Sequence, residues 1–220
     1  IKGTDIGYQS IVNLDPITGR ISYRDGMIPR IGEELNMCPS TSGFKSWRAM
    51  AYSPDTSAMY IPITLNCELA TFGPTERQLG GGGTGPVRRV NYHHPESDGN
   101  LGEVLALNIP SGEVKWRYRT RAPFNTAALT TAGGLVFIGD WNRTMSALDA
   151  ENGELLWQVR LATSNQGFPI SYSVDGKQYI AVQSGWGVDA QREQNLLNMA
   201  KGENHYVPQG GVIWVFALPD

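Results

Sequence analysis

The stretch Ala106-Leu-Asn-Ile-Pro-Ser-Gly-Glu-Val-Lys-Trp116 occurs a second time, in altered form, as Ala147-Leu-Asp-Ala-Glu-Asn-Gly-Glu-Leu-Leu-Trp157. Both copies fit the pattern A-x-[DN]-x-x-[SN]-G-x-x-x-W, and their tryptophans lie 41 residues apart. A repeat of about 40 to 45 residues is the period of a four-stranded propeller blade. The repeat therefore predicts an all-β chain built from successive blades.

Each copy has the pattern of a strand, a tight turn and a second strand. In the first copy an apolar run leads into Pro110-Ser-Gly112, after which Val114, Trp116 and Tyr118 alternate with polar residues. One blade cannot cover both of its own faces, so neighbouring blades must stack on it. We therefore expect Trp116 and Trp157 to pack between blades. A weaker third copy runs from Asn13 to Tyr23.

The composition limits the classes of function. The 220 residues include 26 Gly and 13 Pro, which favours short strands and many turns over long helices. The net charge of −3 gives no basic surface for nucleic acid. No apolar run approaches the roughly 20 residues that span a bilayer, so we expect no membrane span.

Two segments interrupt the repeats. Residues from about 68 to 102 are expected to form an irregular insertion, and the glycines at 80–83 a loop rather than a phosphate site, because no strand precedes them and no helix follows. Residues from about 188 to 210 form a polar insertion, expected to be partly helical at 191–199. The run 211–218 is expected to be a buried strand. About three blades are too few for a closed ring, so another segment or another chain should cover the open sheet.

The two cysteines, Cys38 and Cys67, permit one disulfide without demanding it, because the compartment decides whether it forms. Trp186 stands between two glycines at a predicted strand end. From the residues alone, we favour a core position for it over a ligand contact.

The order of motifs resembles the C-terminal part of the pyrroloquinoline-quinone (PQQ) dependent alcohol dehydrogenases of the methanol or ethanol type. The repeated phrases are similar to the tryptophan-docking motif of that family. Three further segments carry the resemblance: Leu129–Phe137, Val174–Gly187 and the segment from Cys38 to Cys67. In this order they span nearly all of residues 11–218.

The resemblance implies an eight-bladed β-propeller, of which this chain supplies only the C-terminal blades as one partial domain over residues 1–220. It implies PQQ near the propeller axis, a periplasmic location and a Cys38–Cys67 disulfide. It places Gly185 and Trp186 beside the quinone plane and Trp47 against the cofactor. Ser46 stands where an Asn is usual, and Asn125 where many members have a Trp, which points to a different substrate or a degenerate site.

The catalytic chemistry of the family lies mostly outside the matching region. A Ca²⁺ or lanthanide ion polarises the quinone carbonyl at C5, an Asp acts as the base, and hydride passes from the alcohol to C5. These groups match positions upstream of this chain, so we assign it no catalytic base and no metal ligand. The implied partners are the N-terminal remainder of the propeller, an alcohol (or a sugar or aldehyde) and a cytochrome c-type electron acceptor.

A second hypothesis keeps the propeller without the enzyme. Outer-membrane assembly lipoproteins share the docking-type repeat and act as scaffolds that bind protein partners. Ser46 and Asn125 favour this alternative, whereas the cysteine-bounded segment and Gly185-Trp186 favour the dehydrogenase.

Overall fold

The computed structural model describes residues 7–75, 79, 86–187 and 189–217. The chain divides into two compact units, Ile1–Phe44 with Asn66–Asp98 (unit 1) and Lys45–Leu65 with Gly99–Asp220 (unit 2). Each unit is described by itself, so a single domain over residues 1–220 stays a prediction. The glycine-rich loop expected at 80–83 lies outside the described residues.

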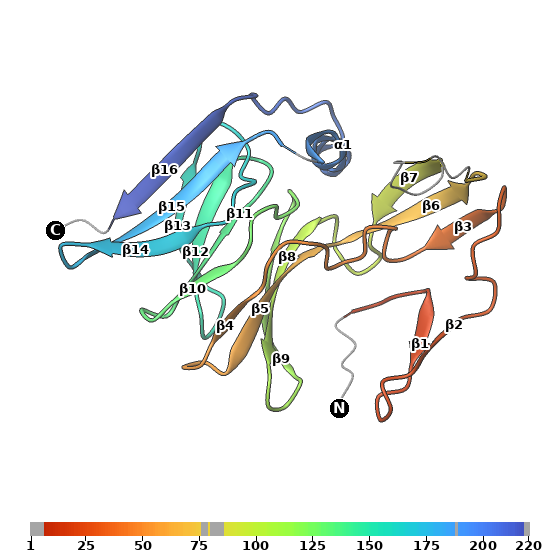
Figure 1. Cartoon of the computed structure of the whole chain (residues 1–220), viewed down its shortest axis with the longest axis horizontal. Coiled ribbons are helices and arrows are strands. Elements are labelled where there is room, and N and C mark those ends of the chain that lie inside the picture. The colour runs from red at the N-terminus through yellow and green to blue at the C-terminus, as the bar shows by residue number, and fades with distance from the viewer. Residues whose placement is uncertain (1–6, 76–78, 80–85, 188, 218–220) are drawn as a thin grey trace. The chain divides into compact units, whose positions relative to one another are not determined.

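Unit 2 consists of three antiparallel sheets and one helix (Figure 1). The first sheet has the order β4 (Ala51–Ser53), β5 (Ala58–Thr64), β8 (Gly102–Asn108) and β9 (Val114–Thr120). The second has β10 (Leu129–Thr131), β11 (Leu135–Gly139), β12 (Thr144–Asp149) and β13 (Leu155–Arg160). The third has β14 (Ile170–Val174), β15 (Lys177–Gly185) and β16 (Gly211–Ala217). The helix, α1 (Ala190–Lys201), lies between β15 and β16 in the chain.

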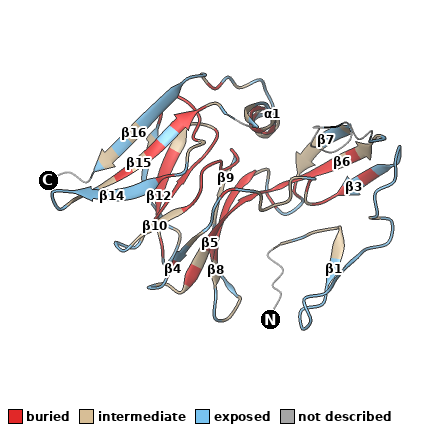
Figure 2. Cartoon of the chain, in the orientation of Figure 1, coloured by how far each residue is buried: buried red, intermediate tan, exposed pale blue. Residues whose placement is uncertain are grey.

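The sheets of unit 2 stack through two apolar cores. The first core joins residues of β5 and β8, such as Tyr60 and Val104, to residues of β11 and β12, such as Ile138 and Leu148. The second joins the other face of the middle sheet to the third sheet through Ile180 and Val182. Figure 2 accordingly shows the middle strands of these sheets as largely buried. Stacking of this kind is what the 41-residue repeat predicts.

Trp116 makes the junction between the first and second sheets. Its indole Nε1 donates a hydrogen bond to the Ala150 carbonyl oxygen at 3.1 Å, and its ring covers Gly153. A Cβ added to Gly153 would lie only 2.7 Å from the indole Cδ2 atom. Trp157 occupies the equivalent place on the second sheet, where its ring meets Phe216 of β16 edge to face at 5.2 Å. Both tryptophans therefore pack between sheets, as expected, but Trp157 stays 37% exposed whereas Trp116 is 8% exposed.

Unit 1 contains a hairpin of β1 (Val12–Leu14) and β2 (Ile21–Tyr23). It also contains a sheet in the order β3 (Glu34–Met37), β6 (Asn66–Phe72) and β7 (Val87–His93). A disulfide joins Cys38 to Cys67, and both residues are buried. The weak third copy of the repeat is thus a strand, turn and strand in the β1–β2 hairpin.

Two expectations about regular structure were wrong. The segment expected to be irregular, about 68–102, contains most of β6 and all of β7. The reason is that β7 carries charged and polar residues on a largely uncovered strand, so its sequence lacks the apolar alternation by which strands are recognised. The strand β16 was expected to be buried, but Ile213 and Val215 are 73% and 52% exposed. Within the described residues β16 pairs only with β15, so one of its edges and much of its surface stay uncovered.

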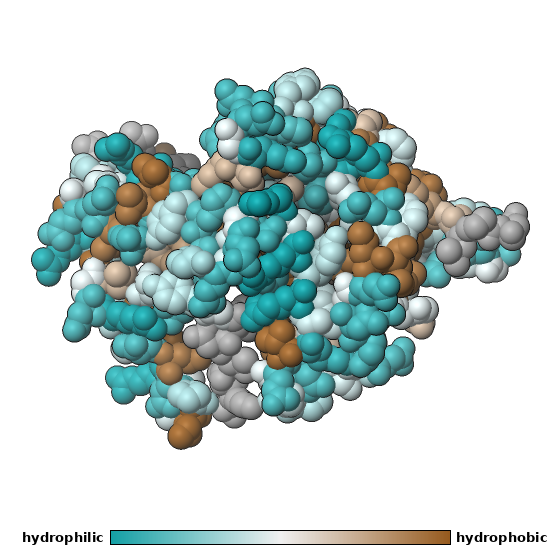
Figure 3. Space-filling model, turned by 180° about the vertical axis from the view of Figure 1, so that it is seen from behind, coloured by the Kyte–Doolittle hydropathy of each residue, from teal (hydrophilic) through white to brown (hydrophobic). Residues whose placement is uncertain are grey.

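The insertion at about 188–210 is helical over residues 190–201, close to the expected 191–199. Among the described residues, no helix has both the length and the apolar character needed to cross a bilayer. The face of the molecule seen in Figure 3 is mainly hydrophilic, and its hydrophobic residues form separate patches.

Candidate functional site

Connections between strands of unit 2 meet beside helix α1. Asn125 lies between β9 and β10, and its backbone N–H donates to the carbonyl oxygen of Gly139 at the end of β11. Trp141 follows in the β11–β12 turn, and its ring packs against Trp186 with the ring centroids 5.6 Å apart. Two of the residues predicted for the cofactor site, Asn125 and Trp186, are thereby linked through one turn.

Helix α1 packs on this aromatic pair. Leu197 and Val207 are completely buried against Trp141, and Ala190 packs on the same cluster. The indole Nε1 of Trp141 donates to Gln194 Oε1 on the helix at 3.2 Å. The polar insertion is therefore fixed to the site by an apolar contact and by a buried hydrogen bond.

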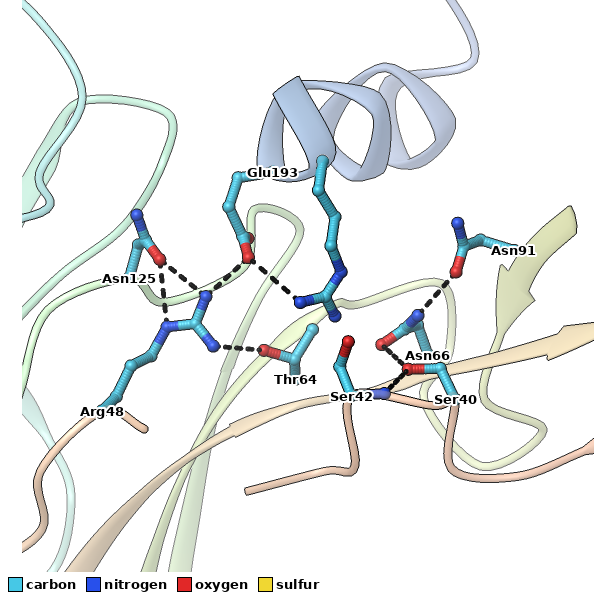
Figure 4. A network of polar contacts seen from close by, with 9 residues as sticks. Ser40, Ser42, Arg48, Thr64, Asn66, Asn91, Asn125 and Glu193 are labelled. Atoms are coloured by element: carbon cyan, nitrogen blue, oxygen red, sulfur yellow. Dashed lines mark hydrogen bonds and ion pairs between the residues drawn. The ribbon is translucent and has the colours of Figure 1, made fainter. Parts of the chain in front are cut away.

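A buried guanidinium connects α1 to Asn125 (Figure 4). Arg48 Nε and Nη2 both donate to Asn125 Oδ1, at 3.0 and 2.6 Å. Nη2 also donates to Glu193 Oε1 at 2.6 Å, and Nη1 to the Thr64 hydroxyl at 3.4 Å. The side chains of Arg48 and Glu193 are 3% and 0% exposed, so this ion pair is shielded from water. Removing one partner of such a pair leaves an uncompensated buried charge.

Two buried donors of this site have no hydrogen-bond partner among the described residues. They are Asn125 Nδ2 and Trp186 Nε1. Because Arg48 donates twice to Asn125 Oδ1, the carboxamide has a fixed orientation, and Figure 4 shows its nitrogen turned away from the guanidinium. The second carboxylate oxygen of Glu193, Oε2, is also buried without a partner. Buried groups of this kind usually have partners, so a cluster of exceptions is a sign of a ligand site.

The remaining predicted residues lie on the same unit. Trp47 directly precedes Arg48, is 49% exposed, and its ring lies 6.0 Å from that of Phe168. Ser46 is half-buried, and its carbonyl oxygen accepts a hydrogen bond from Lys45 Nζ. At Gly185 an added Cβ would lie 2.7 Å from the Gly210 carbonyl oxygen, so only glycine fits where the insertion begins. Their roles as cofactor contacts stay predictions.

Asp140 directly precedes Trp141 and is buried. Burial raises its pKa to about 7, although hydrogen bonds from Thr144 and the charge of Arg160 favour the ionised form. The backbone N–H of Thr144 donates to Asp140 Oδ1 at 2.8 Å. His205 forms a hydrogen bond with Asn142 of the same turn, and partial burial and the charges of Lys201 and Arg160 lower its pKa.

Sequence reasoning missed Arg48, Trp141 and Glu193. Arg48 follows a predicted site residue, but its partner Glu193 lies 145 residues further along the chain. A single Glu in a polar insertion carries no signal of that pairing. Trp141 stands in a turn of the repeat, where its position in the sequence suggested only a hairpin.

In the described ranges there is no group of three or more His, Cys, Asp or Glu side chains that could hold a metal ion. In unit 1 a separate polar cluster lies near the disulfide (Figure 4). Asn66 donates to Asn91 Oδ1 at 2.9 Å, as Figure 4 shows. The backbone N–H of Thr41 donates to the buried Glu68 at 2.7 Å. These contacts are satisfied within the unit and stabilise the turn after Cys38.

Comparison with known proteins agrees with the fold. Residues 99–180 match the family model described as "PQQ: Glucose/ethanol/alcohol dehydrogenase, beta-propeller domain". The quinoprotein alcohol dehydrogenase PedH of Pseudomonas putida is 30% identical over 213 residues, which cover 91% of this chain and 34% of PedH. The quinoprotein ethanol dehydrogenase of Pseudomonas aeruginosa is 30% identical over 218 residues, covering 94% of this chain and 33% of that protein.

A solved structure gives the same result. A europium-containing methanol dehydrogenase matches 98% of this chain with a TM-score of 0.86 and 25% sequence identity. The match covers 40% of that structure. The chain thus spans about a third of the length of the curated relatives it matches. The predicted all-β propeller fold is confirmed, with this chain supplying part of it.

Proposed function

We propose, from the confirmed resemblance to the PQQ-dependent alcohol dehydrogenases, that this chain is part of a dehydrogenase that oxidises an alcohol by hydride transfer to PQQ. In this proposal unit 2 supplies one wall of the cofactor site, and the remainder of the propeller comes from polypeptide outside this chain. When bound, PQQ supplies the quinone that accepts the hydride.

The observation that supports the wall is the pair of buried donors without partners, Asn125 Nδ2 and Trp186 Nε1. PQQ is a flat molecule whose rim carries carboxylate and carbonyl oxygens, all of them hydrogen-bond acceptors. Donors that have lost water without gaining a partner cost about 1–3 kcal/mol each. An acceptor from the cofactor would remove that cost, so the donor set of this chain fits the group.

Each predicted residue has a role that its chemistry allows. The Trp186 indole offers a flat apolar face and a donor at its edge, and Trp47 offers a second, half-exposed aromatic surface. Gly185 lets the backbone at Gly210 approach closely, and this glycine directly precedes Trp186 in the chain. Asn125 donates through Nδ2 in the orientation that Arg48 imposes. Ser46 stands two residues before Arg48 in the sequence.

The rest of the machinery is assigned to polypeptide outside this chain. It would hold the Asp base and the Ca²⁺ or lanthanide ion, which acts as a Lewis acid on the quinone. We propose a periplasmic location, which suits the buried Cys38–Cys67 disulfide because such bonds persist in oxidising compartments. A cytochrome c-type protein would then accept the electrons.

The activity test uses the longest polypeptide that the gene encodes, loaded with PQQ and either Ca²⁺ or a lanthanide. We expect alcohol-dependent reduction of an artificial electron acceptor. Inactivity across alcohols, aldehydes and sugars would contradict the proposal and favour the scaffold hypothesis.

Binding by the wall is tested with Trp186→Phe, which keeps an aromatic ring and removes the Nε1 donor. We expect the Kd for PQQ to rise about tenfold, since a hydrogen bond to a charged group contributes about 1.5 kcal/mol or more. The thermal unfolding midpoint should change little. Trp157→Phe is the matched control. The Trp157 ring packs against Phe216 and belongs to the sheet junction, so this variant should leave the Kd for PQQ unchanged. An unchanged Kd in Trp186→Phe would return Trp186 to a packing role.

A further inference from the structure

The two donors assigned to the cofactor are covered in this structure. Asn125 is 1% exposed, and Trp186 Nε1 is buried. A ligand atom cannot reach a donor that water cannot reach, so binding requires some neighbouring group to move. The cover therefore has to be identified from the contacts of unit 2.

Helix α1 is the element of unit 2 that joins both ends of the site. It contacts the aromatic pair through Ala190 and Leu197, and it reaches the Arg48–Asn125 group through Glu193. Two of its apolar side chains, Leu196 and Leu197, are fully buried. The same helix thus packs against Trp186 and holds the guanidinium that orients Asn125.

The chain that follows α1 contains residues suited to movement. The segment that contains α1 begins after Gly185, the last residue of β15, and ends at Gly211, the first residue of β16. These two glycines are paired in the β15–β16 register. Gly202 ends the helix with φ +71°, and Gly210 follows on the returning segment. At Gly202, Gly210 and Gly211 an added Cβ would meet nothing within 4 Å. Residues without a packing constraint can change their backbone angles at low cost, which is the property of a hinge.

We propose that α1 is a lid over the candidate cofactor wall, and that the Arg48–Glu193 ion pair is the latch that keeps it closed. The pair and the Trp141–Gln194 hydrogen bond favour the closed position. The unpartnered Asn125 Nδ2, Trp186 Nε1 and Glu193 Oε2 oppose it. Opening would give these groups water or ligand as partners, at the cost of the apolar contacts that Leu197 and Ala190 make in the closed position. The inference rests on the proposed function for the identity of the ligand, and on unit 2 alone for the latch.

The latch is tested without any ligand by hydrogen–deuterium exchange of the backbone amides of 190–201 in the full polypeptide. In Glu193→Gln we expect these amides to exchange about tenfold faster or more, because the charge-assisted contact is lost. Amides of β11 and β12 should exchange at the wild-type rate. Gln191→Ala, on the exposed side of the same helix, is the matched control and should not accelerate exchange. Wild-type exchange of α1 in Glu193→Gln would overturn the latch.

Glu193→Gln leaves a buried Arg48 without its counter-charge, and this could unfold the chain. A second variant therefore separates loss of the ion pair from the effect of an unpaired buried charge. Arg48→Gln with Glu193→Gln removes both charges and keeps a polar side chain at each position. Exchange of α1 should again be accelerated relative to wild type. Wild-type exchange in this double variant would also contradict the latch.

Gating is tested by the rate of PQQ association, followed by quenching of tryptophan fluorescence. We expect Glu193→Gln to bind PQQ faster than wild type, since the open lid is more populated. An unchanged or slower rate together with faster α1 exchange would show that α1 moves but does not gate the site. If the wild type and both variants bind no PQQ, the proposed function and the gating fail together, whereas exchange still decides whether the latch exists.

Discussion

At the scale of single residues, the candidate site is organised by Arg48. Its two hydrogen bonds to one oxygen fix the Asn125 carboxamide, because a flipped amide would place two donors against the guanidinium. A position where related dehydrogenases were expected to carry a Trp is thus occupied by an oriented polar donor. From the sequence alone, Asn125 suggests a degenerate site. In the structure its side chain is held in one orientation by Arg48, as expected of a residue that positions a hydrogen-bond donor.

Asp140 makes a prediction about pH. Its pKa in the folded chain is about 7, against an ordinary value of 3.8, and burial is the main cause. The folded state therefore holds this proton more tightly than the unfolded state, so stability is lost as the pH rises from about 4 to about 7. Above pH 7 the ionised carboxylate costs on the order of 4 kcal/mol.

Asp140→Asn should therefore flatten this dependence. The amide keeps an oxygen to accept the Thr144 N–H and cannot ionise. In thermal unfolding of the chain, the wild-type midpoint should fall between pH 5 and pH 8 by more than that of the variant. Parallel curves for the two proteins would show that Asp140 does not titrate in this range.

At the scale of elements, the first and second sheets of unit 2 pack together where the Trp116 ring covers Gly153. Gly153 has φ +78° and lies under the Trp116 ring, whereas Gly176 has the same φ and open space around its Cα. Gly153→Ala should destabilise the chain by about 1–3 kcal/mol more than Gly176→Ala, because both share the backbone strain and only the first overpacks the ring. Chemical denaturation of the two variants measures this difference. Equal losses would mean that the ring shifts without cost.

The disulfide belongs to unit 1 and closes a loop with a sequence separation of 29. On the loop-entropy model, Cys38→Ala with Cys67→Ala should lower the free energy of unfolding of this unit by about 3–4 kcal/mol. A reducing agent should destabilise the wild type by a similar amount and leave the double variant unaffected. A double variant as stable as the oxidised wild type would contradict the expectation.

How far the sequence predicts an element depends on whether its contacts repeat. The β8–β9 and β12–β13 hairpins could be predicted because the same turn and the same tryptophan occur twice. The strand β7 could not be predicted, because it is held by β6 and carries few apolar residues. The candidate site was predicted at Asn125 and Trp186 from resemblance. Its ion pair was not, because Arg48 and Glu193 meet only through the path of the whole chain.

At the scale of the whole molecule, the third sheet of unit 2 differs from its neighbours. It has three described strands, β14, β15 and β16, which lie side by side in chain order. In each of the other two sheets a fourth strand follows in the same order. Trp157, which faces it, is accordingly more exposed than Trp116. A fourth strand along the free edge of β16 would complete the pattern, and we propose that polypeptide outside this chain provides it.

The two tryptophans test this proposal. In the 220-residue chain, Trp116→Ala should cost about 3–5 kcal/mol of stability, and Trp157→Ala clearly less because a third of its surface already meets water. In the longest polypeptide that the gene encodes, the two losses should become similar. Denaturation of both variants in both contexts decides the matter, and a persistently small loss at Trp157 would argue against a covering strand.

The Trp116–Gly153 contact has a consequence for how such a chain can change in length. The tryptophan belongs to one copy of the phrase and the glycine to the next, so this junction is shared by two consecutive copies. Inserting one full period of 41 residues between the two copies would leave Trp116 facing the glycine turn of the copy that follows it. An insertion of any other length between Trp116 and Gly153 would displace the glycine turn from the tryptophan ring. The contact therefore allows growth by whole units, with loops such as the α1 segment free to diverge because no junction passes through them.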